Sequence, residues 1–215
     1  PPALLGRALR SAAGWFASRF ITPPGVKSVR RSVRALSGLG RFPCFDLLGE
    51  VVLSDAEADA SLRRHLVLLE ELSRHPLAFQ ETPAGAAALQ LSLKLSSLSP
   101  HWSPLDPEGS IEGARYRLSA ICERPLRAGV GVTVDLERVE LRDLSFELSR
   151  RLFDRGQELG GWRHAGIVLQ AYHADAARFA EALIAFARRR CVPFQVRLVK
   201  GAYWDQEVLA ASANR

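Results

Sequence analysis

The chain has 215 residues, of which 47% are hydrophobic and 24% are charged, a composition typical of soluble globular proteins. No apolar run reaches the roughly 18 to 20 residues that a membrane-spanning helix needs. The three cysteines, Cys44, Cys122 and Cys191, are far apart and in no metal-ligand spacing, so we expect a reducing compartment and no metal site.

The net charge of +6 comes from the start of the chain. Residues 1–45 hold eight of the 29 basic residues and no acidic one, which leaves 21 basic against 23 acidic residues in the remainder. A basic arm can contact nucleic acid, an anionic membrane or an import receptor. We favour a solvated helical leader and expect no nucleic-acid partner for this segment. The predicted division is a basic helical arm, residues 1–40, and a main domain, residues 41–215.

The main domain predicts strands that alternate with helices. Short apolar segments bounded by turn residues indicate strands at 42–48, 89–95, 129–136, 165–171 and 194–199. Helical patterns lie between them, at 55–74, 107–128, 141–154 and 175–190, and a further helix begins after Gly201. The first of these helices carries a capping box, Ser54-Asp-Ala-Glu57.

Strands that recur roughly every 30 to 50 residues, with helices between them, indicate parallel βα units. No Gly-x-Gly-x-x-Gly follows the first strand, which argues against a Rossmann dinucleotide site. We therefore predict an α/β fold, a (β/α)8 TIM-like barrel that is truncated after about five βα units and preceded by a helical arm. Such a partial barrel is expected to expose a face of Val, Leu and Phe side chains.

Each predicted strand carries a polar residue near its C-terminal end, where barrels of this kind place their active sites. These residues are Asp46 or Glu50, Lys94, Asp135, Gln170, and Arg197 with Lys200. Burying an unpaired charge costs several kcal/mol, so their recurrence indicates a functional site. The alternative is a structural network in which Asp135 neutralises Lys94.

A cation-rich mouth suits an electron-rich cofactor or an anionic substrate. Arg197 and Lys200 would favour the reduced, anionic form of a flavin ring. Gln170 offers an amide donor and acceptor to the heteroatoms of such a ring. Tyr203 and Trp204 supply flat apolar surface.

Lys94 also permits a different chemistry. A desolvated lysine beside other cations has a lowered pKa, which suits a Schiff-base nucleophile. A (β/α)8 aldolase that uses Lys94 is therefore the alternative enzyme class.

Five stretches together resemble the proline dehydrogenase family, most closely the proline dehydrogenase domain of the bifunctional bacterial proline-utilisation proteins of the PutA type. One nine-residue stretch is highly specific, and four weaker motifs occur in the family's order and spacing. The stretches are Arg197-Leu-Val-Lys-Gly-Ala-Tyr-Trp-Asp205, Phe45-Asp-Leu-Leu-Gly-Glu50, Leu93-Lys-Leu-Ser96, Val134-Asp-Leu-Glu137 and Leu169-Gln-Ala-Tyr172.

The resemblance implies a distorted barrel that binds FAD without a Rossmann fold and oxidises L-proline to 1-pyrroline-5-carboxylate in proline catabolism. It implies a membrane quinone as electron acceptor and a possible C-terminal aldehyde dehydrogenase domain in the parent chain. The implied location is the bacterial cytoplasm, in peripheral contact with the inner face of the membrane, or alternatively the mitochondrion.

Individual positions carry over from the same motifs. Lys94, Asp135 and Tyr203 correspond to substrate-pocket positions, and Glu50 to an acidic gate residue that pairs with an arginine of the last barrel helix. The last helix and strands six to eight are not in this chain, so an inactive fragment without turnover is the third reading. The positions that correspond to FAD contacts are Gln170, Arg197, Val199, Lys200, Gly201, Ala202 and Trp204.

Overall fold

The computed structural model describes residues 2–17, 21–23, 25–49 and 51–213, and the chain divides into two compact units, Pro1–Pro43 and Cys44–Arg215. The first unit contains α1 (Pro2–Ala17) and α2 (Val26–Ser37). In α2 the basic side chains of Lys27, Arg31 and Arg34 are exposed. Within the part of the chain that the structure describes, no helix is long and apolar enough to cross a membrane.

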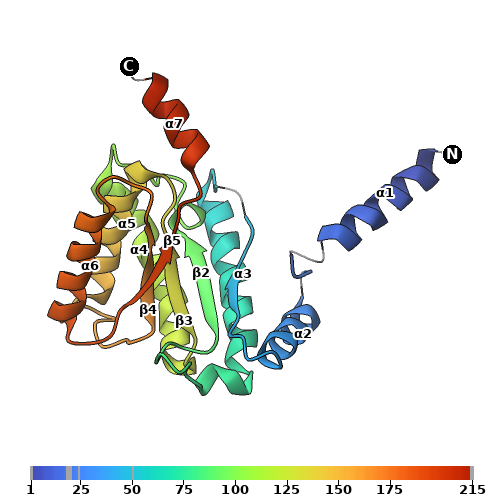
Figure 1. Cartoon of the computed structure of the whole chain (residues 1–215), viewed down its shortest axis with the longest axis horizontal. Coiled ribbons are helices and arrows are strands. Elements are labelled where there is room, and N and C mark those ends of the chain that lie inside the picture. The colour runs from blue at the N-terminus through green and yellow to red at the C-terminus, as the bar shows by residue number, and fades with distance from the viewer. Residues whose placement is uncertain (1, 18–20, 24, 50, 214–215) are drawn as a thin grey trace. The chain divides into compact units, whose positions relative to one another are not determined.

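The second unit is built on a parallel sheet whose strands lie in sequence order, from β1 to β5. Figure 1 shows α3 to α6 packed around the sheet and α7 projecting from the end at which the strands finish. The strands are β1 (Cys44–Asp46), β2 (Gln90–Lys94), β3 (Gly131–Asp135), β4 (Ala165–Gln170) and β5 (Gln195–Val199). The helices are α3 (Asp55–Ser73), α4 (Pro107–Ala128), α5 (Arg142–Phe153), α6 (Ala176–Arg190) and α7 (Trp204–Ala213). Short 3-10 turns lie at η1 (Pro76–Phe79), η2 (Leu95–Ser97) and η3 (Val139–Leu141).

The predicted α/β fold is confirmed, because five parallel strands in sequence order are the arrangement that the first five units of a (β/α)8 barrel would have. The Ser54 half of the predicted capping box forms, whereas the Glu57 carboxylate bonds to the residue before the cap. The Ser54 hydroxyl accepts a hydrogen bond from the Glu57 amide at 3.3 Å, while the Glu57 carboxylate accepts one from the Leu53 amide at 2.7 Å. Local sequence signals therefore place this helix start correctly.

The two faces of the sheet differ in polarity. Side chains that face the helices are apolar and buried, as at Leu91, Val132 and Ile167. The alternate positions on the concave face are mostly polar, among them Gln90, Ser92, Lys94, Thr133 and Asp135. The concave face is therefore not the uncovered Val, Leu and Phe face that was expected, because the strands follow a period of two that puts most Val and Leu side chains on the helix side of the sheet.

Exposed apolar side chains are instead found on the helix side of the edge strand β5. Val196 is 42% exposed and Leu198 is 68% exposed. Their neighbour β4 is covered by α6, whereas α7 leads away from the sheet instead of packing on β5.

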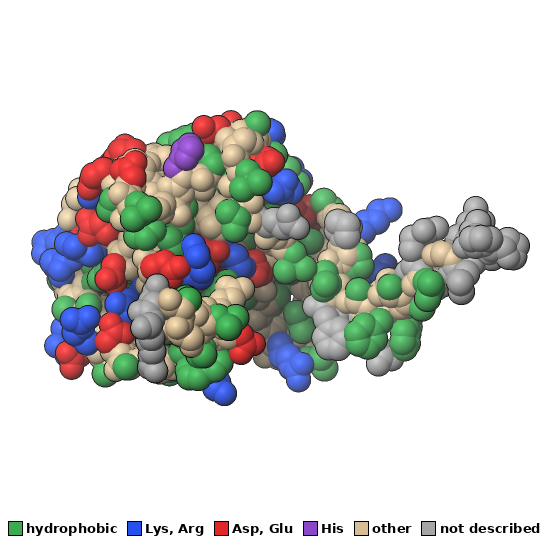
Figure 2. Space-filling model, turned by 90° about the horizontal axis from the view of Figure 1, so that it is seen from above, with side chains coloured by type: hydrophobic (Ala, Val, Ile, Leu, Met, Phe, Trp, Pro, Cys, Tyr) green, Lys and Arg blue, Asp and Glu red, His purple; other side chains and the backbone are tan. Residues whose placement is uncertain are grey.

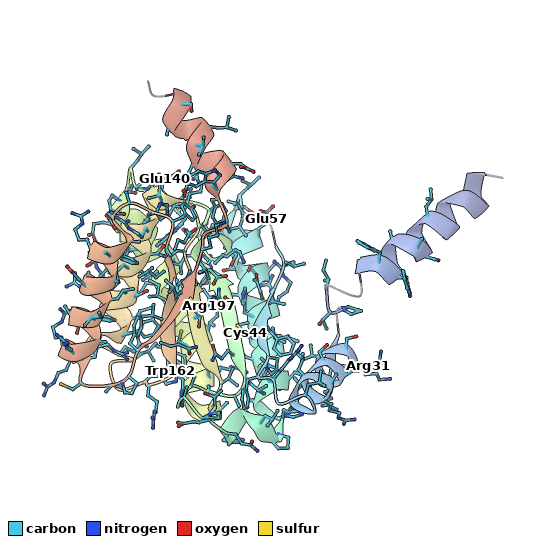
Figure 3. All side chains as sticks on the ribbon, in the orientation of Figure 1. Arg31, Cys44, Glu57, Glu140, Trp162 and Arg197 are labelled. Atoms are coloured by element: carbon cyan, nitrogen blue, oxygen red, sulfur yellow. The ribbon has the colours of Figure 1, made fainter. Side chains whose placement is uncertain are left out.

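The sheet is strongly curled. Neighbouring strands are about 4.8 Å apart, so in a flat sheet the edge strands β1 and β5 would be about 19 Å apart, too far for their side chains to meet. Yet the Arg197 Nη1 atom of β5 lies 3.7 Å from the Cys44 Sγ atom of β1, and Figure 3 labels the two residues close together over the sheet. The Gln195 amide likewise donates to Gln90 of β2 at 3.1 Å. This curvature is what a barrel wall requires.

One buried arginine stabilises the opposite, N-terminal end of β4 and β5. Arg190, the last residue of α6, is 2% exposed and donates to backbone carbonyls at distances of 2.5 to 3.4 Å. Burial lowers the pKa of this guanidinium. The acceptors are the carbonyl oxygens of Phe153, Gly160, Trp162 and Pro193.

We predict that Arg190→Met destabilises the domain by about 3 kcal/mol or more, because several buried carbonyls lose their donor. The matched control is Arg188→Met, two residues earlier in the same helix turn, where the side chain is exposed. The measurement is the urea midpoint of the full-length protein, followed by a probe in this domain. Equal midpoints for the two variants would contradict the structural role assigned to Arg190.

Candidate active site

A cavity of about 760 Å³ opens at the carboxyl end of the strands. Figure 2 looks onto this end of the molecule and shows acidic and basic side chains interspersed over the body. Lys94, Glu137, Tyr203 and His65 are among the residues that line the cavity. His65 is buried, its Nδ1 atom lies 2.8 Å from the Ser61 carbonyl oxygen, and burial lowers its pKa, so the cavity wall contains a neutral imidazole.

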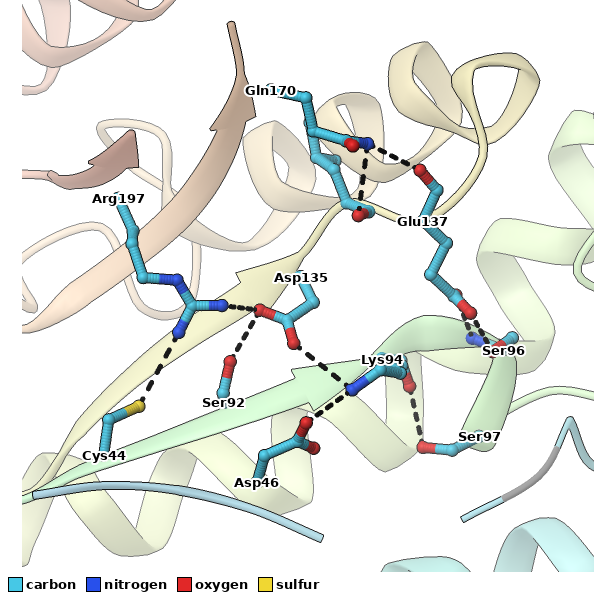
Figure 4. Close-up of polar contacts among 11 residues, drawn as sticks. Cys44, Asp46, Ser92, Lys94, Ser96, Ser97, Asp135, Glu137, Gln170 and Arg197 are labelled. Atoms are coloured by element: carbon cyan, nitrogen blue, oxygen red, sulfur yellow. Dashed lines mark hydrogen bonds and ion pairs between the residues drawn. The ribbon is translucent and has the colours of Figure 1, made fainter. Parts of the chain in front are cut away.

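Asp135, the last residue of β3, is the centre of a charge cluster below this cavity (Figure 4). Its carboxylate accepts hydrogen bonds from the Ser92 hydroxyl at 2.6 Å, from Lys94 Nζ at 3.4 Å and from the Arg197 guanidinium. Lys94 also contacts the Asp46 carboxylate at 2.7 Å. Two cations and two carboxylates from four strands thus balance one another.

The environment of Lys94 determines its protonation. Burial lowers the pKa of the Lys94 ammonium, but the adjacent carboxylates of Asp46 and Asp135 outweigh burial, and the pKa is raised above its usual range. The expected lowering of this pKa is therefore wrong. A lysine that stays protonated is a poor Schiff-base nucleophile.

A second network joins the last residue of β4 to the loops that follow β2, β3 and β5. Gln170 is 4% exposed, and its amide nitrogen donates to the Glu137 carbonyl oxygen at 2.6 Å, while its Oε1 atom accepts from the Ala202 amide at 3.3 Å. The Glu137 carboxylate in turn accepts from the Ser96 hydroxyl at 2.7 Å and the Ser96 amide at 3.3 Å. Gln170 therefore holds loop backbone in place at the cavity rim.

The segment after β5 passes close to an aromatic ring. Gly201 has φ +141°, and a Cβ atom built on it would lie 1.3 Å from a carbon of the Tyr172 ring. The Trp204 ring packs edge-on against Tyr172, with centroids 5.8 Å apart, yet Trp204 remains 60% exposed. Burial raises the pKa of the Tyr203 phenol, and the nearby Glu137 carboxylate adds a smaller contribution in the same direction. Glycine at 201 is thus required by packing within the chain itself.

The remaining sequence candidates lie as follows. Val199 pairs with Gln170 in the β4 to β5 register, and Lys200 and Ala202 are exposed beside it. Glu50 falls outside the described residues. In the described ranges, no cluster of three or more His, Cys, Asp or Glu residues could hold a metal ion, and the three cysteines are free.

Several participants were missed or left open by sequence reasoning. Asp46 was an alternative to Glu50, and the structure makes it the nearest carboxylate to Lys94. Ser92, Ser96 and Glu137 were not proposed as site residues, although the last two lie within motifs that the resemblance used. For Ser92 the sequence signal was its position: it lies two residues before Lys94 and therefore on the same face of the strand.

The fold and the site define an α/β barrel-type enzyme domain with a charge-paired site at the carboxyl ends of its strands. The family model described as proline dehydrogenase matches residues 29–215, so the chain belongs to the proline dehydrogenase family.

Relatives of known name agree with this assignment. The chain is 27% identical over 213 residues to the bifunctional protein PutA of Escherichia coli strain K12, covering 98% of this chain and 16% of that protein. It is 27% identical over 199 residues to proline dehydrogenase 1 of Bacillus subtilis strain 168, covering 93% and 56%. The crystal structure of PutA from Bdellovibrio bacteriovorus, inactivated by N-propargylglycine, superimposes with a TM-score of 0.87 at 27% identity over 99% of this chain and 23% of that one. The chain thus spans only a part of the relatives it matches.

We predict that Gly201→Ala distorts the 200–204 segment, because the new methyl group overlaps the Tyr172 ring and the backbone conformation is unfavourable for alanine. The melting temperature should fall by at least about 4 °C. Gly161→Ala is the control, since no atom lies within 4 Å of its added Cβ. Combining Gly201→Ala with Tyr172→Ala should recover part of the loss; strictly additive losses would show that the ring is not the obstacle.

Proposed function

We propose that the protein containing this chain is a proline dehydrogenase that oxidises L-proline to 1-pyrroline-5-carboxylate with FAD as cofactor. Family membership over residues 29–215 supports the reaction class. The observation that carries the proposal is the position of the 197–205 motif, which spans the carboxyl end of β5 and brings Tyr203 to the same cavity as Lys94.

The donor chemistry of the site suits a flavin. Arg197 keeps part of its guanidinium accessible while it pairs with Asp135, and Lys200, three residues later, is exposed. Trp204 presents an exposed ring, and Val199 and Gly201 lie between Arg197 and Trp204 along the chain. Cations and a flat apolar surface are what an electron-rich, partly anionic ring system needs, so we assign Arg197, Lys200 and Trp204 to hold it. When bound, the flavin supplies the acceptor for two electrons.

The cavity and the carboxylates that pair with its Lys94 suit the zwitterion of proline. Conversion of proline to 1-pyrroline-5-carboxylate removes a hydride equivalent from C5, the ring carbon next to nitrogen that does not carry the carboxylate. It also removes one proton from that nitrogen. Lys94 can face the substrate carboxylate, while Asp46 and Asp135 can face the ammonium group, because opposite charges favour both placements. Tyr203 contributes a ring at the wall of the same cavity. Ground-state orientation is thus the role we assign to Lys94, Asp135 and Tyr203, with Glu50 as a gate.

Further features of the whole protein are proposed from likeness to the PutA relatives. We propose a quinone as the final electron acceptor, peripheral contact with the inner face of a bacterial membrane from the cytoplasm, and an aldehyde dehydrogenase domain elsewhere in the full-length chain. The description of the relatives as bifunctional supports the last of these. We keep residues 1–40 as a basic arm preceding the barrel domain that starts at residue 41.

The first test is anaerobic addition of L-proline to the full-length protein. We expect the visible absorbance of the oxidised flavin to bleach, because two electrons pass from proline to the ring. Borohydride trapping should leave Lys94 unmodified, because its ammonium is paired with two carboxylates. Unbleached flavin, or a borohydride adduct on Lys94 formed with a carbonyl substrate, would favour the aldolase reading.

The second test concerns the Lys94 and Asp135 pair. Lys94→Ala and Asp135→Ala should each lower kcat/KM for proline, at a cost on the order of 3 to 5 kcal/mol where the abandoned partner charge stays buried. The double variant should cost less than the sum of the single ones, since the two side chains contact each other. Lys27→Ala, at an exposed lysine of α2, is the control. Strict additivity would contradict a functional pair.

A further inference from the structure

A further partly buried carboxylate, that of Glu207, lies at the same end of the sheet. Glu207 belongs to the first turn of α7, and its side chain is 13% exposed. Its Oε2 atom accepts a hydrogen bond from the Tyr172 hydroxyl at 2.6 Å, and its Oε1 atom accepts one from the Val139 amide at 3.1 Å. Both carboxylate oxygens are therefore engaged.

The partners of Glu207 come from different loops. Val139 begins the turn that follows β3, the strand of Asp135, and Tyr172 follows β4, the strand of Gln170. Glu207 itself follows β5, the strand of Arg197. One carboxylate thus connects the three loops that leave the strands carrying the candidate site.

The side-chain hydrogen bonds of Glu207 also attach its helix to the rest of the domain. Along 204–213, the described extent of α7, no residue is buried, so apolar packing contributes little to the placement of this helix. The Glu207 amide bonds to the Tyr203 carbonyl at 3.0 Å, which couples the helix directly to the residue at the cavity wall. Tyr172, the partner of Glu207, packs against Gly201 and Trp204 on the other side.

One further side chain lies close to the Glu207 carboxylate. The His173 Nδ1 atom lies 3.8 Å from Glu207 Oε2, and both side chains are largely shielded from solvent. Burial, and to a smaller extent the hydrogen bond to Glu207, raises the pKa of Tyr172 to about 12. The phenol therefore stays protonated and remains the hydrogen-bond donor.

We propose that Glu207 is a positioning residue for the substrate cavity: it ties the loops after β3, β4 and β5 together and so fixes Tyr203 at the cavity wall. This inference rests on the proposed function for its kinetic consequence, but the connection of the three loops stands on the contacts alone. The rival explanation is that Glu207 merely complements the helix dipole, as acidic residues in a first turn commonly do.

Three variants of the full-length protein separate the two explanations. Glu207→Ala removes both acceptors. Glu207→Gln removes the charge but keeps the shape, because its carbonyl oxygen can accept from Val139 while its amino group donates to the Tyr172 hydroxyl oxygen. Asp205→Ala removes an equal charge from the same turn at an exposed position.

We expect Glu207→Ala to raise KM for proline on the order of tenfold, with a smaller effect on kcat and unchanged flavin content, since a displaced cavity wall weakens substrate placement. Glu207→Gln should return KM to within about threefold of the wild type, and Asp205→Ala should leave KM unchanged. A helix-dipole role predicts the opposite ranking, in which Glu207→Gln resembles Glu207→Ala and Asp205→Ala shares the defect.

Hydrogen exchange gives a measurement that does not depend on turnover. In Glu207→Ala, amides in 137–141, 170–174 and 200–207 should exchange faster together, while amides of β2 and β3 stay protected. Tyr172→Phe, which deletes only the hydroxyl, should speed exchange in 200–207 and serves if Glu207→Ala does not fold. Faster exchange confined to α7 would overturn the proposal. If proline fails to reduce the wild-type flavin, the proposed function fails, but the exchange pattern still decides whether Glu207 connects the loops.

Discussion

The Asp135 carboxylate is the constraint on which the candidate site depends. Its contacts with Ser92, Lys94 and Arg197 join β2, β3 and β5, and Asp46 completes the charge balance from β1. Isolated charges in such a partly buried place would be costly, and mutual pairing removes most of that cost. The cluster can therefore keep two cations charged beside a cavity, where an anionic substrate or cofactor can meet them.

This pairing requires the sheet to curl. Side chains of Arg197 and Cys44 could not approach across a flat five-stranded sheet, and the polar concave face is where the curl brings them together. The same period of two that directs Val and Leu under the helices leaves Ser, Thr, Gln and charged residues to fill the hollow. Fold and site thus depend on one pattern, since the apolar half of each strand stabilises the sheet and the polar half furnishes the chemistry.

The loops after the strands are positioned mainly by hydrogen bonds. Gln170 and Glu137 hold the loops after β2, β3 and β5 through backbone groups, and Gly201 lets the chain pass against the Tyr172 ring. Since α7 buries none of its described residues, 204–213, polar contacts have a larger share in its placement than packing has. Residues that match a cofactor motif therefore also position the loops of this chain. Variants that change one hydrogen bond at a time are needed to separate cofactor binding from loop positioning.

The sequence by itself determined the identity and order of the strands and helices, because hydrophobic period, capping residues and turn residues act over short distances along the chain. It also located polar residues at the strand ends, and so identified Lys94, Asp135, Gln170 and Arg197 as candidates.

The sequence did not determine which of these side chains would contact one another. Asp46 and Lys94 are 48 residues apart, and Cys44 and Arg197 are 153 apart, so their contacts depend on strand register and on the curl of the whole sheet. The raised pKa of Lys94 follows from those contacts alone, since burial by itself would have lowered it. Only the tertiary structure could decide whether the pKa of Lys94 is raised or lowered, because the balance between desolvation and ion pairing is set by neighbours that are distant in sequence.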